Sequence, residues 1–304
     1  MPTDQQEIIE EIKRLKAERN AIILVHNYQP AEIQDIADIL GDSLELARAA
    51  ATMDGEVIVF CGVDFMAETA AILSPRKPVL LPAGDSCCPM ADMITAENLQ
   101  KAKKDHPGAA VVCYVNSSAE VKAESDICCT SSNAVKVVNA LDEDEILFVP
   151  DRNLGRYCQR FTKKKVIPWD GYCYVHDRIT PAQVLAAKRA HPNAIVLVHP
   201  ECRPEVIDLA DYAVSTSGMI QEVCSSKTDD FIIGTETGIL YRLKKDCPKK
   251  QCYPLAESAF CRDMKKTSLA MVRDSLVTLT PRIVVPDEIA ARARCAIERM
   301  LALP

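Results

Sequence analysis

Short apolar runs that end in polar residues recur three times along the chain. They read AIILVHNYQP (21–30), AAVVCYVNSS (109–118) and AIVLVHPECR (194–203). A continuous, largely β-branched run of this length is typical of a strand buried on both faces of a parallel sheet. The pattern therefore predicts three buried strands that deliver polar side chains at their carboxyl ends.

The repeat continues beyond these strands. Each is followed by a second short strand that leads into a helical stretch, with a hydroxyl residue at the matched position: Ser43, Ser131 and Thr216. A third apolar run comes next, at EVIVFCG (56–62), EILFVPD (145–151) and FIIGTET (231–237). A cysteine then follows at similar spacing: Cys88, Cys173 and Cys261. Strands that alternate with helices predict parallel sheets covered by helices.

Helix signals delimit the repeats. Thr95 and Thr180 each stand before a helical pattern, and Pro181 suits the first turn of its helix. Ser268 occupies the third matched position. We expect an α/β fold of three pseudo-threefold-related, three-layer αβα domains with short parallel sheets around a central cavity. The expected ranges are 1–94, 95–179 and 180–285, closed by a C-terminal amphipathic helix over 286–304, and a charged amphipathic helix is expected over 1–20.

Composition narrows the class of protein. The 304 residues are 48% hydrophobic and 26% charged, with a net charge of −7, which is typical of a soluble globular protein and argues against nucleic-acid or anionic-membrane partners. No apolar run approaches the roughly 20 residues that a membrane span needs. The charged start does not resemble a secretory signal, so we expect a cytoplasmic protein whose fourteen cysteines are mostly reduced.

Polar groups at matched strand ends indicate a ligand site. The alignment pairs His26 with Tyr114 and His199, and it pairs Tyr28 with Asn116 and Glu201. Ligands bind at the carboxyl ends of parallel strands, and three such ends facing one axis would bring these groups into one cavity. The hydroxyls of Ser43, Ser131 and Thr216 at helix starts suit carboxylate or phosphate, although simple helix capping explains them as well. The set predicts a site for a polar, anionic small molecule.

The three matched cysteines allow several interpretations. Three thiolates can hold zinc with an open fourth position, or three irons of a [4Fe–4S] cluster whose fourth iron acts as a Lewis acid. Buried core cysteines are the third interpretation. A zinc- or redox-sensing binding protein and a structural scaffold therefore remain alternatives to an enzyme. Of the adjacent pair, only Cys88 is in register, and Cys87 is expected to point away and pack.

Longer motifs resemble the quinolinate synthase family over nearly the whole chain. They are VHNYQ (25–29), GDSLELA (41–47), CPMAD (88–92), YVNSSAEVKA (114–123), WDGYCYVH (169–176), VHPEC (198–202), STSGM (215–219), GTETGILYRL (234–243) and AFCRDMKKT (259–267). The resemblance implies three α/β domains around a central cavity and an oxygen-labile [4Fe–4S] cluster held by Cys88, Cys173 and Cys261. It also implies a transferase of NAD biosynthesis that condenses iminoaspartate with dihydroxyacetone phosphate, losing phosphate and water, to form quinolinate.

The resemblance also suggests roles for individual residues. Tyr28 matches the acid–base tyrosine of the family, Tyr28 and Glu201 are the expected proton carriers, and His199 is expected to hold an oxygen of the triose. The positions that match the substrate site are His26, Ser43, Tyr114, Asn116, Ser131, His199, Glu201 and Thr216. The open iron is expected to coordinate a substrate oxygen. A transient contact with L-aspartate oxidase, which makes iminoaspartate, is a hypothesis that the sequence leaves open.

Four further cysteines lie outside this pattern. Cys247 and Cys252 stand five positions apart in a lysine-rich loop, where reduced surface thiols are expected rather than a disulfide. Cys128 and Cys129 lie close to Ser131 in the sequence, and no role is assigned to them.

Overall fold

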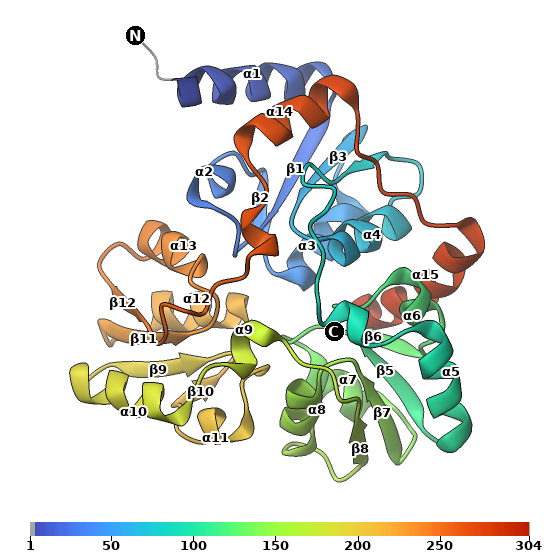
Figure 1. Ribbon diagram of the computed structural model, residues 1–304, viewed down its shortest axis with the longest axis vertical. Coiled ribbons are helices and arrows are strands. Elements are labelled where there is room, and N and C mark those ends of the chain that lie inside the picture. The colour runs from blue at the N-terminus through green and yellow to red at the C-terminus, as the bar shows by residue number, and fades with distance from the viewer. Residues whose placement is uncertain (1–3, 304) are drawn as a thin grey trace.

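Three parallel sheets of four strands form the three lobes of the molecule. The computed structural model describes residues 4–303, and its lobes lie at the corners of a triangle (Figure 1). The strand orders are β2-β1-β3-β4, β6-β5-β7-β8 and β10-β9-β11-β12, so each sheet has the same topology. The expected α/β fold with three short parallel sheets is confirmed.

The elements follow the chain lobe by lobe. The first lobe contains α1 (Asp4–Glu18), β1 (Ala21–His26), α2 (Ala31–Gln34), β2 (Ile39–Gly41), α3 (Ser43–Thr52), β3 (Val57–Cys61), α4 (Asp64–Leu73), β4 (Val79–Leu80) and the 3-10 helix η1 (Ala91–Met93). The second contains α5 (Ala96–Asp105), β5 (Ala110–Tyr114), α6 (Ala119–Ala123), β6 (Ile127–Cys129), α7 (Ala134–Ala140), β7 (Glu145–Val149), α8 (Arg152–Gln159), β8 (Lys165–Pro168) and α9 (Tyr174–Asp177).

The third lobe and the C-terminal segment complete the chain. The third lobe contains α10 (Pro181–Ala190), β9 (Ile195–Val198), α11 (Pro204–Ile207), β10 (Tyr212–Ala213), α12 (Thr216–Ser225), β11 (Asp230–Gly234), α13 (Ile239–Asp246), β12 (Gln251–Pro254) and the 3-10 helix η2 (Asp263–Lys265). The segment after it forms α14 (Leu269–Thr278) and α15 (Asp287–Ala302).

Matched hydroxyls open a helix in each repeat, as expected for two of them. Thr95 accepts a hydrogen bond from the backbone N–H of Asn98 at 3.2 Å, and Thr180 accepts one from Gln183 at 3.3 Å. Ser268 does the same at the start of α14. These bonds satisfy backbone donors that have no partner within the first helical turn.

A matched aspartate joins the first two strands of every sheet. Its carboxylate accepts a backbone N–H of the central strand at 2.7–2.8 Å, and its own N–H donates to the carbonyl of that same residue. The pairs are Asp38 with Ile23, Asp126 with Val111, and Asp211 with Val196. The hydrophobic pattern did not single out this residue, yet it fixes where each second strand begins.

Replacing Asp126 by Ala is expected to lower the free energy of unfolding by about 1–3 kcal/mol, because the fully buried N–H of Val111 loses its carboxylate partner. Urea denaturation followed by circular dichroism measures the change. Asp54→Ala, at an exposed position, is the matched control and should unfold like the parent protein. Equal free energies of unfolding for the two variants would show that the Asp126 carboxylate does not stabilise the fold.

The C-terminal segment ties the lobes together. Helix α14 lies within the range expected for the third domain, but it packs against α1 beside the first sheet (Figure 1). The chain then crosses the first lobe, where Ile283 donates its N–H to the carbonyl of Val79 at 2.9 Å. Helix α15 lies against α6 and β6 of the second lobe. The domain ranges remain a prediction, and residues 1–3 and 304 lie outside the described residues.

One disulfide corrects the expectation of reduced thiols around Cys247. Cys247 pairs with Cys224, which lies near the end of α12, and not with its sequence neighbour Cys252. The packing of α12 against α13 brings the Cα atoms of Cys224 and Cys247 to 5.5 Å, within the usual range for a disulfide. Cys128 and Cys129 are free and fully buried in the second sheet, so they pack in the core.

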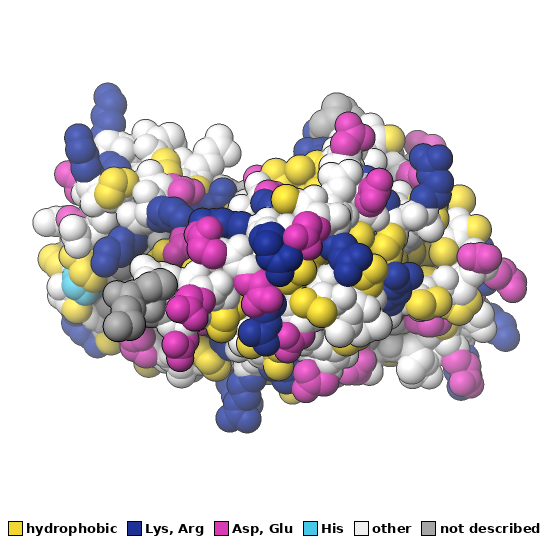
Figure 2. Space-filling model, turned by 90° about the horizontal axis from the view of Figure 1, so that it is seen from above, with side chains coloured by type: hydrophobic (Ala, Val, Ile, Leu, Met, Phe, Trp, Pro, Cys, Tyr) yellow, Lys and Arg dark blue, Asp and Glu magenta, His cyan; other side chains and the backbone are white. Residues whose placement is uncertain are grey.

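The surface carries mixed charge. Figure 2 shows one face of the molecule, on which basic and acidic side chains are interspersed without an extended basic patch. Such a face offers no single-sign field that would attract a nucleic acid.

None of the helices between residues 4 and 303 combines the length and the apolar composition that crossing a membrane requires.

Candidate active site

A central cavity receives side chains from all three lobes. The central strands β1 and β5 end at His26 and Tyr114, and His199 directly follows β9. The residues that the sequence assigned to the site all line this cavity: His26, Tyr28, Ser43, Cys88, Tyr114, Asn116, Ser131, Cys173, His199, Glu201, Thr216 and Cys261. Residues far apart in the sequence thus meet because the three sheets present their carboxyl ends to one centre.

Three half-buried thiols line the cavity, one from each lobe. Cys88, Cys173 and Cys261 follow the last strand of their sheets. Burial raises the pKa of all three thiols, and Cys261 raises that of Cys88 further while Cys88 adds to that of Cys173. Each thiol therefore disfavours ionisation of its neighbour, and a bound cation would have the opposite effect on the pKa values. The donor set fits a metal centre that prefers thiolates.

A carboxylate positions the backbone of each of these cysteines. Asp151 accepts the N–H of Cys173 at 3.3 Å, and Glu236 accepts the N–H of Cys261 at 3.2 Å. The carboxylate of Asp64 lies near the backbone of Cys88, which offsets part of the rise in pKa that burial causes in Asp64. All three carboxylates stand just after the third strand of their sheet, so the repeat positions the thiol loops as well as the thiols.

Cys87 differs from the expectation that it would point away and pack. It also borders the cavity and does not join the apolar core. Its Sγ lies 3.9 Å from Oδ1 of Asp263, and partial burial together with this carboxylate raises the pKa of its thiol. The reason is local, because the turn after β4 holds Cys87 against η2 rather than against the sheet. Its neighbours are carboxylates, whereas those of Cys88 include the other thiols.

Glu201 is the charged centre of the cavity. The hydroxyl of Tyr114 donates to its Oε1 at 2.5 Å, and Nδ1 of His176 lies 2.6 Å from its Oε2. Burial alone would raise the pKa of this carboxyl, but the two imidazoles and these hydrogen bonds outweigh burial and lower the pKa to about 2. Glu201 is therefore ionised at neutral pH and can accept a proton.

Tyr28, unlike Glu201, keeps its proton. Burial raises its pKa well above the usual value for a phenol, so its hydroxyl is protonated and can act as an acid. The hydroxyl lies 2.5 Å from Oγ1 of Thr235, and the ring packs edge-on against His26 with centroids 4.7 Å apart. The cavity thus holds an ionised carboxylate and a neutral phenol, the combination that proton transfer in both directions needs.

Two neutral histidines supply N–H donors. Burial lowers the pKa of both His26 and His199 to about 3. Nδ1 of His26 accepts the backbone N–H of Tyr28 at 3.2 Å, and Nδ1 of His199 accepts that of Glu201 at 3.3 Å. Because Nδ1 is an acceptor in a neutral ring, Nε2 carries the proton in each case. Both rings line the cavity and can donate to oxygens of a ligand.

The matched hydroxyls are not helix caps. Ser43 and Thr216 are the first residues of α3 and α12, and the caps are their predecessors Asp42 and Ser215. Ser131 lies in the turn before α7. Capping therefore does not account for these hydroxyls, which line the cavity beside the positive ends of two ten-residue helices.

An unpartnered polar atom also faces this space. Oδ1 of Asn116 is buried and has no hydrogen-bond partner among the described residues. Buried acceptors of this kind are rare in proteins without a bound group, because each lost hydrogen bond is costly. Asn116 lines the cavity, so it is suited to accept a hydrogen bond from a ligand.

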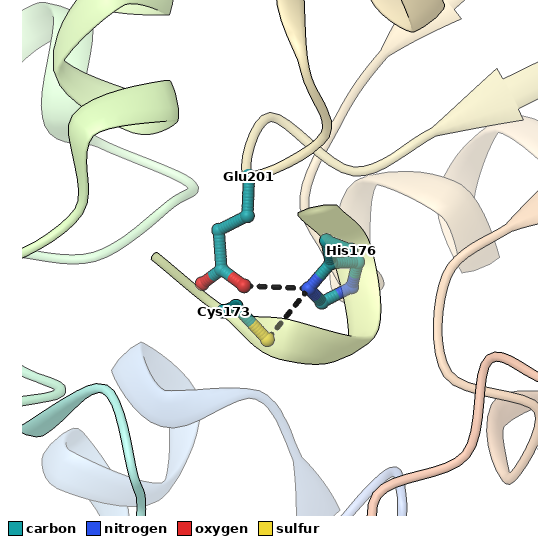
Figure 3. A group of neighbouring side chains, drawn as sticks. All are labelled: Cys173, His176 and Glu201. Atoms are coloured by element: carbon teal, nitrogen blue, oxygen red, sulfur yellow. Dashed lines mark hydrogen bonds and ion pairs between the residues drawn. The ribbon is translucent and has the colours of Figure 1, made fainter. Parts of the chain in front are cut away.

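The structure adds residues that sequence reasoning missed. His176 lies one helical turn after Cys173, and its Nδ1 is 3.2 Å from Cys173 Sγ (Figure 3). Cys173, His176 and Glu201 offer ligand atoms within 4.8 Å of one another, so they could hold a metal ion. The Cys-x-x-His spacing was a usable signal for His176. Thr235 and Glu236, at the end of β11, could have been found only as residues that follow a strand.

These features define an enzyme with a potential metal centre that acts on a small polar molecule. The family model described as "Quinolinate synthetase A protein" matches residues 10–302. The quinolinate synthase of Methanoregula boonei is 69% identical over 97% of each chain. That of Geotalea uraniireducens is 56% identical over 99% of each chain, and quinolinate synthase 1 of Methanosarcina acetivorans is 52% identical over 98% of each. The chain belongs to the quinolinate synthase family, whose activity serves NAD biosynthesis.

Proposed function

We propose that the protein is a transferase that condenses iminoaspartate with dihydroxyacetone phosphate to form quinolinate, releasing phosphate and two molecules of water. We further propose that it acts in the cytoplasm. The observation that carries the proposal is the convergence of ionised Glu201, protonated Tyr28 and the three thiols on one buried cavity.

The three thiols support a [4Fe–4S] cluster as the cofactor. Cys88, Cys173 and Cys261 would hold three of its irons, which matches one thiol from each lobe at the cavity wall. Bound there, such a cluster supplies a free iron as a Lewis acid for a carbonyl, hydroxyl or carboxylate oxygen. The remaining chemistry falls to side chains of the chain itself.

Proton transfer is proposed for Tyr28 and Glu201. Loss of water requires that a base takes a proton from carbon and that an acid protonates the departing hydroxyl. Glu201 is ionised and suits the first task, while Tyr28 is protonated and suits the second. His199 lies beside Glu201, with its Nδ1 3.7 Å from Oε2, and its Nε2–H can hold an oxygen of the triose.

We propose that helix dipoles and uncharged hydrogen-bond donors, rather than cationic side chains, bind the anionic groups of the substrates. No Lys or Arg is among the described residues that line the cavity. The positive ends of α3 and α12, with Ser43 and Thr216, can hold carboxylate or phosphate by hydrogen bonds, and His26 adds an N–H. Ser131 and Asn116 complete this set on the second lobe, with Tyr114 fixed on Glu201.

Transfer of iminoaspartate from L-aspartate oxidase remains part of the proposal. An imine of this kind is hydrolysed by water, so a transient contact between the two enzymes would limit its loss.

A second candidate function rests on the group formed by Cys173, His176 and Glu201. Sulfur, nitrogen and oxygen donors at this spacing suit a single zinc ion with an open fourth position. A zinc protein of this kind would use only one of the three matched cysteines. Metal analysis separates it from the cluster.

The proposed reaction is tested with anaerobically purified protein. L-Aspartate and L-aspartate oxidase generate iminoaspartate in the reaction, dihydroxyacetone phosphate is added, and quinolinate and phosphate are measured. We expect equal amounts of the two products and no quinolinate when the triose is omitted. A protein that contains iron and yet forms no quinolinate would contradict the proposed function.

A further inference from the structure

A buried amide stands behind one of the cavity hydroxyls. Asn27 directly follows β1, is fully buried and does not itself line the cavity. Its Nδ2 donates to Oγ1 of Thr216, in the third lobe, at 3.2 Å. The matched residues of the other two repeats are apolar, Val115 and Pro200. Burying an amide is costly unless its hydrogen bonds are made, so the partners of Asn27 indicate what it does.

Arg242 holds the other end of this amide. Its Nη1 donates to Oδ1 of Asn27 at 2.5 Å and to the backbone carbonyl of Leu40, in the first lobe, at 2.8 Å. Its Nε lies 3.0 Å from Oδ2 of Asp246, one turn further along α13. The guanidinium is therefore fixed by three partners between the first and third lobes. Hydrogen bonds from a charged donor are stronger than neutral ones, so Arg242 determines how the amide is turned.

These partners decide which atoms donate. A guanidinium only donates, so the amide oxygen faces Arg242 and the amide nitrogen faces Thr216. Oγ1 of Thr216 is then the acceptor of an N–H, and its own proton remains for another acceptor. Thr216 is the first residue of α12, so no preceding helical turn offers it a carbonyl. Because Thr216 lines the cavity, this proton is available to a ligand there.

We propose that Asn27 and Arg242 are positioning residues that direct the hydroxyl proton of Thr216 toward a carboxylate or phosphate oxygen of the substrate. This inference rests on the proposed function, in which Thr216 binds an anionic group. A hydroxyl that is not held rotates about its C–O bond and presents either its proton or a lone pair, and only the proton favours an anion.

The arrangement also lets a cation outside the cavity support anion binding inside it. Arg242 is not among the residues that line the cavity. Its charge is nevertheless felt at the wall, because burial lowers the pKa of His26 and the charges of Lys265 and Arg242 lower it further. A guanidinium that acts through an amide and a hydroxyl thus replaces a cationic side chain in direct contact with the ligand.

The test compares Asn27→Asp with the parent protein, both purified without oxygen. Aspartate keeps the shape and a partner for Arg242, but its oxygens only accept, so Thr216 must turn its proton toward the new carboxylate and away from the ligand. The affinity for quinolinate or for dihydroxyacetone phosphate should fall about 10- to 100-fold, the range for a hydrogen bond to a charged group. Isothermal titration calorimetry measures each ligand separately.

The ligand that loses affinity identifies the group that Thr216 holds. A loss for quinolinate assigns a carboxylate, a loss for dihydroxyacetone phosphate assigns the phosphate, and a loss for both assigns one shared anion position. Parental affinity for both ligands would overturn the proposal. Asn193→Asp and Arg189→Met, at exposed positions of the third lobe, are matched controls and should bind both ligands like the parent.

A double-mutant cycle separates the proposed path from simple repulsion by the new carboxylate. In Thr216→Val the hydroxyl is absent and its direction no longer matters, so adding Asn27→Asp should cause little further loss of affinity. A further loss as large as that in the parent would show direct repulsion and would overturn the proposal. Arg242→Met leaves the amide free to turn, so it should weaken binding in the parent and add nothing to Thr216→Val.

Steady-state kinetics supply a readout that a purely structural role would not move. Asn27→Asp should raise KM for the substrate whose group Thr216 holds and change kcat little, because it removes binding and leaves Tyr28 and Glu201 intact. A fall in kcat at unchanged KM would contradict the inference. Should Asn27→Asp fail to fold, the cycle of Arg242→Met with Thr216→Val decides the question.

The proposed function and this inference fail separately. If the parent protein forms no quinolinate, the proposed function fails and the inference falls with it. If the parent forms quinolinate and Asn27→Asp binds both ligands as the parent does, only the inference fails.

Discussion

The Cys88→Ser variant is expected to lose its iron and its formation of quinolinate, whereas Cys87→Ser keeps both. The two residues are adjacent, but their surroundings differ. Cys88 has the thiols of Cys261 and Cys173 as neighbours, whereas Cys87 faces the carboxylate of Asp263. A ligand to a shared metal centre must have the other ligands as its neighbours, which selects Cys88.

Serine is a stringent replacement at this position. It replaces only the sulfur by oxygen, so the fold should remain. A serine hydroxyl is a harder and far less acidic ligand than a thiol, so it does not suit an iron–sulfur cluster. Each variant is purified without oxygen, and its iron, sulfide and quinolinate formation are measured. If Cys87→Ser were the iron-free variant, the assignment from the repeat would be wrong by one residue.

The Tyr28→Phe variant should retain its iron but form quinolinate about 10²–10⁴-fold more slowly, the usual contribution of a positioned acid or base. Phenylalanine keeps the edge-on packing against His26 and removes only the hydroxyl that bonds to Thr235. The loss should therefore appear in kcat and not in folding.

Tyr212→Phe serves as the matched control, because Tyr212 is 48% exposed and lies away from the cavity lining. It should have the parental rate. Steady-state assays with saturating dihydroxyacetone phosphate measure both variants. A parental rate in Tyr28→Phe would remove Tyr28 from its role as the catalytic acid.

Much of the fold could be predicted from local patterns. The buried strands that end at His26, at Tyr114 and just before His199 have the apolar composition of central parallel strands. Thr95 and Thr180 cap helices as their sequence context indicates. These features depend on residues close together in the chain, where periodicity and capping are informative. The matched positions of the three repeats then predicted that the cysteines and the strand-end groups meet in a common cavity.

Other features depend on contacts that no local pattern encodes. Thr235 bonds to Tyr28 across 207 positions of the chain and to His176 across 59, so its place in the site follows only from the packing of two lobes. The Cys224–Cys247 disulfide joins two helices that pack side by side, and proximity in the sequence pointed to Cys252 instead. The return of α14 onto α1 is a long-range contact of the same kind.

The central claim is that three thiols, one from each lobe, hold an iron–sulfur cluster in a cavity built for proton transfer. The most direct measurement is the metal content and visible spectrum of protein purified without oxygen. A [4Fe–4S] cluster predicts a brown protein with broad visible absorption and about four irons and four sulfides per chain. A colourless protein that holds one zinc ion, or no metal at all, would contradict it.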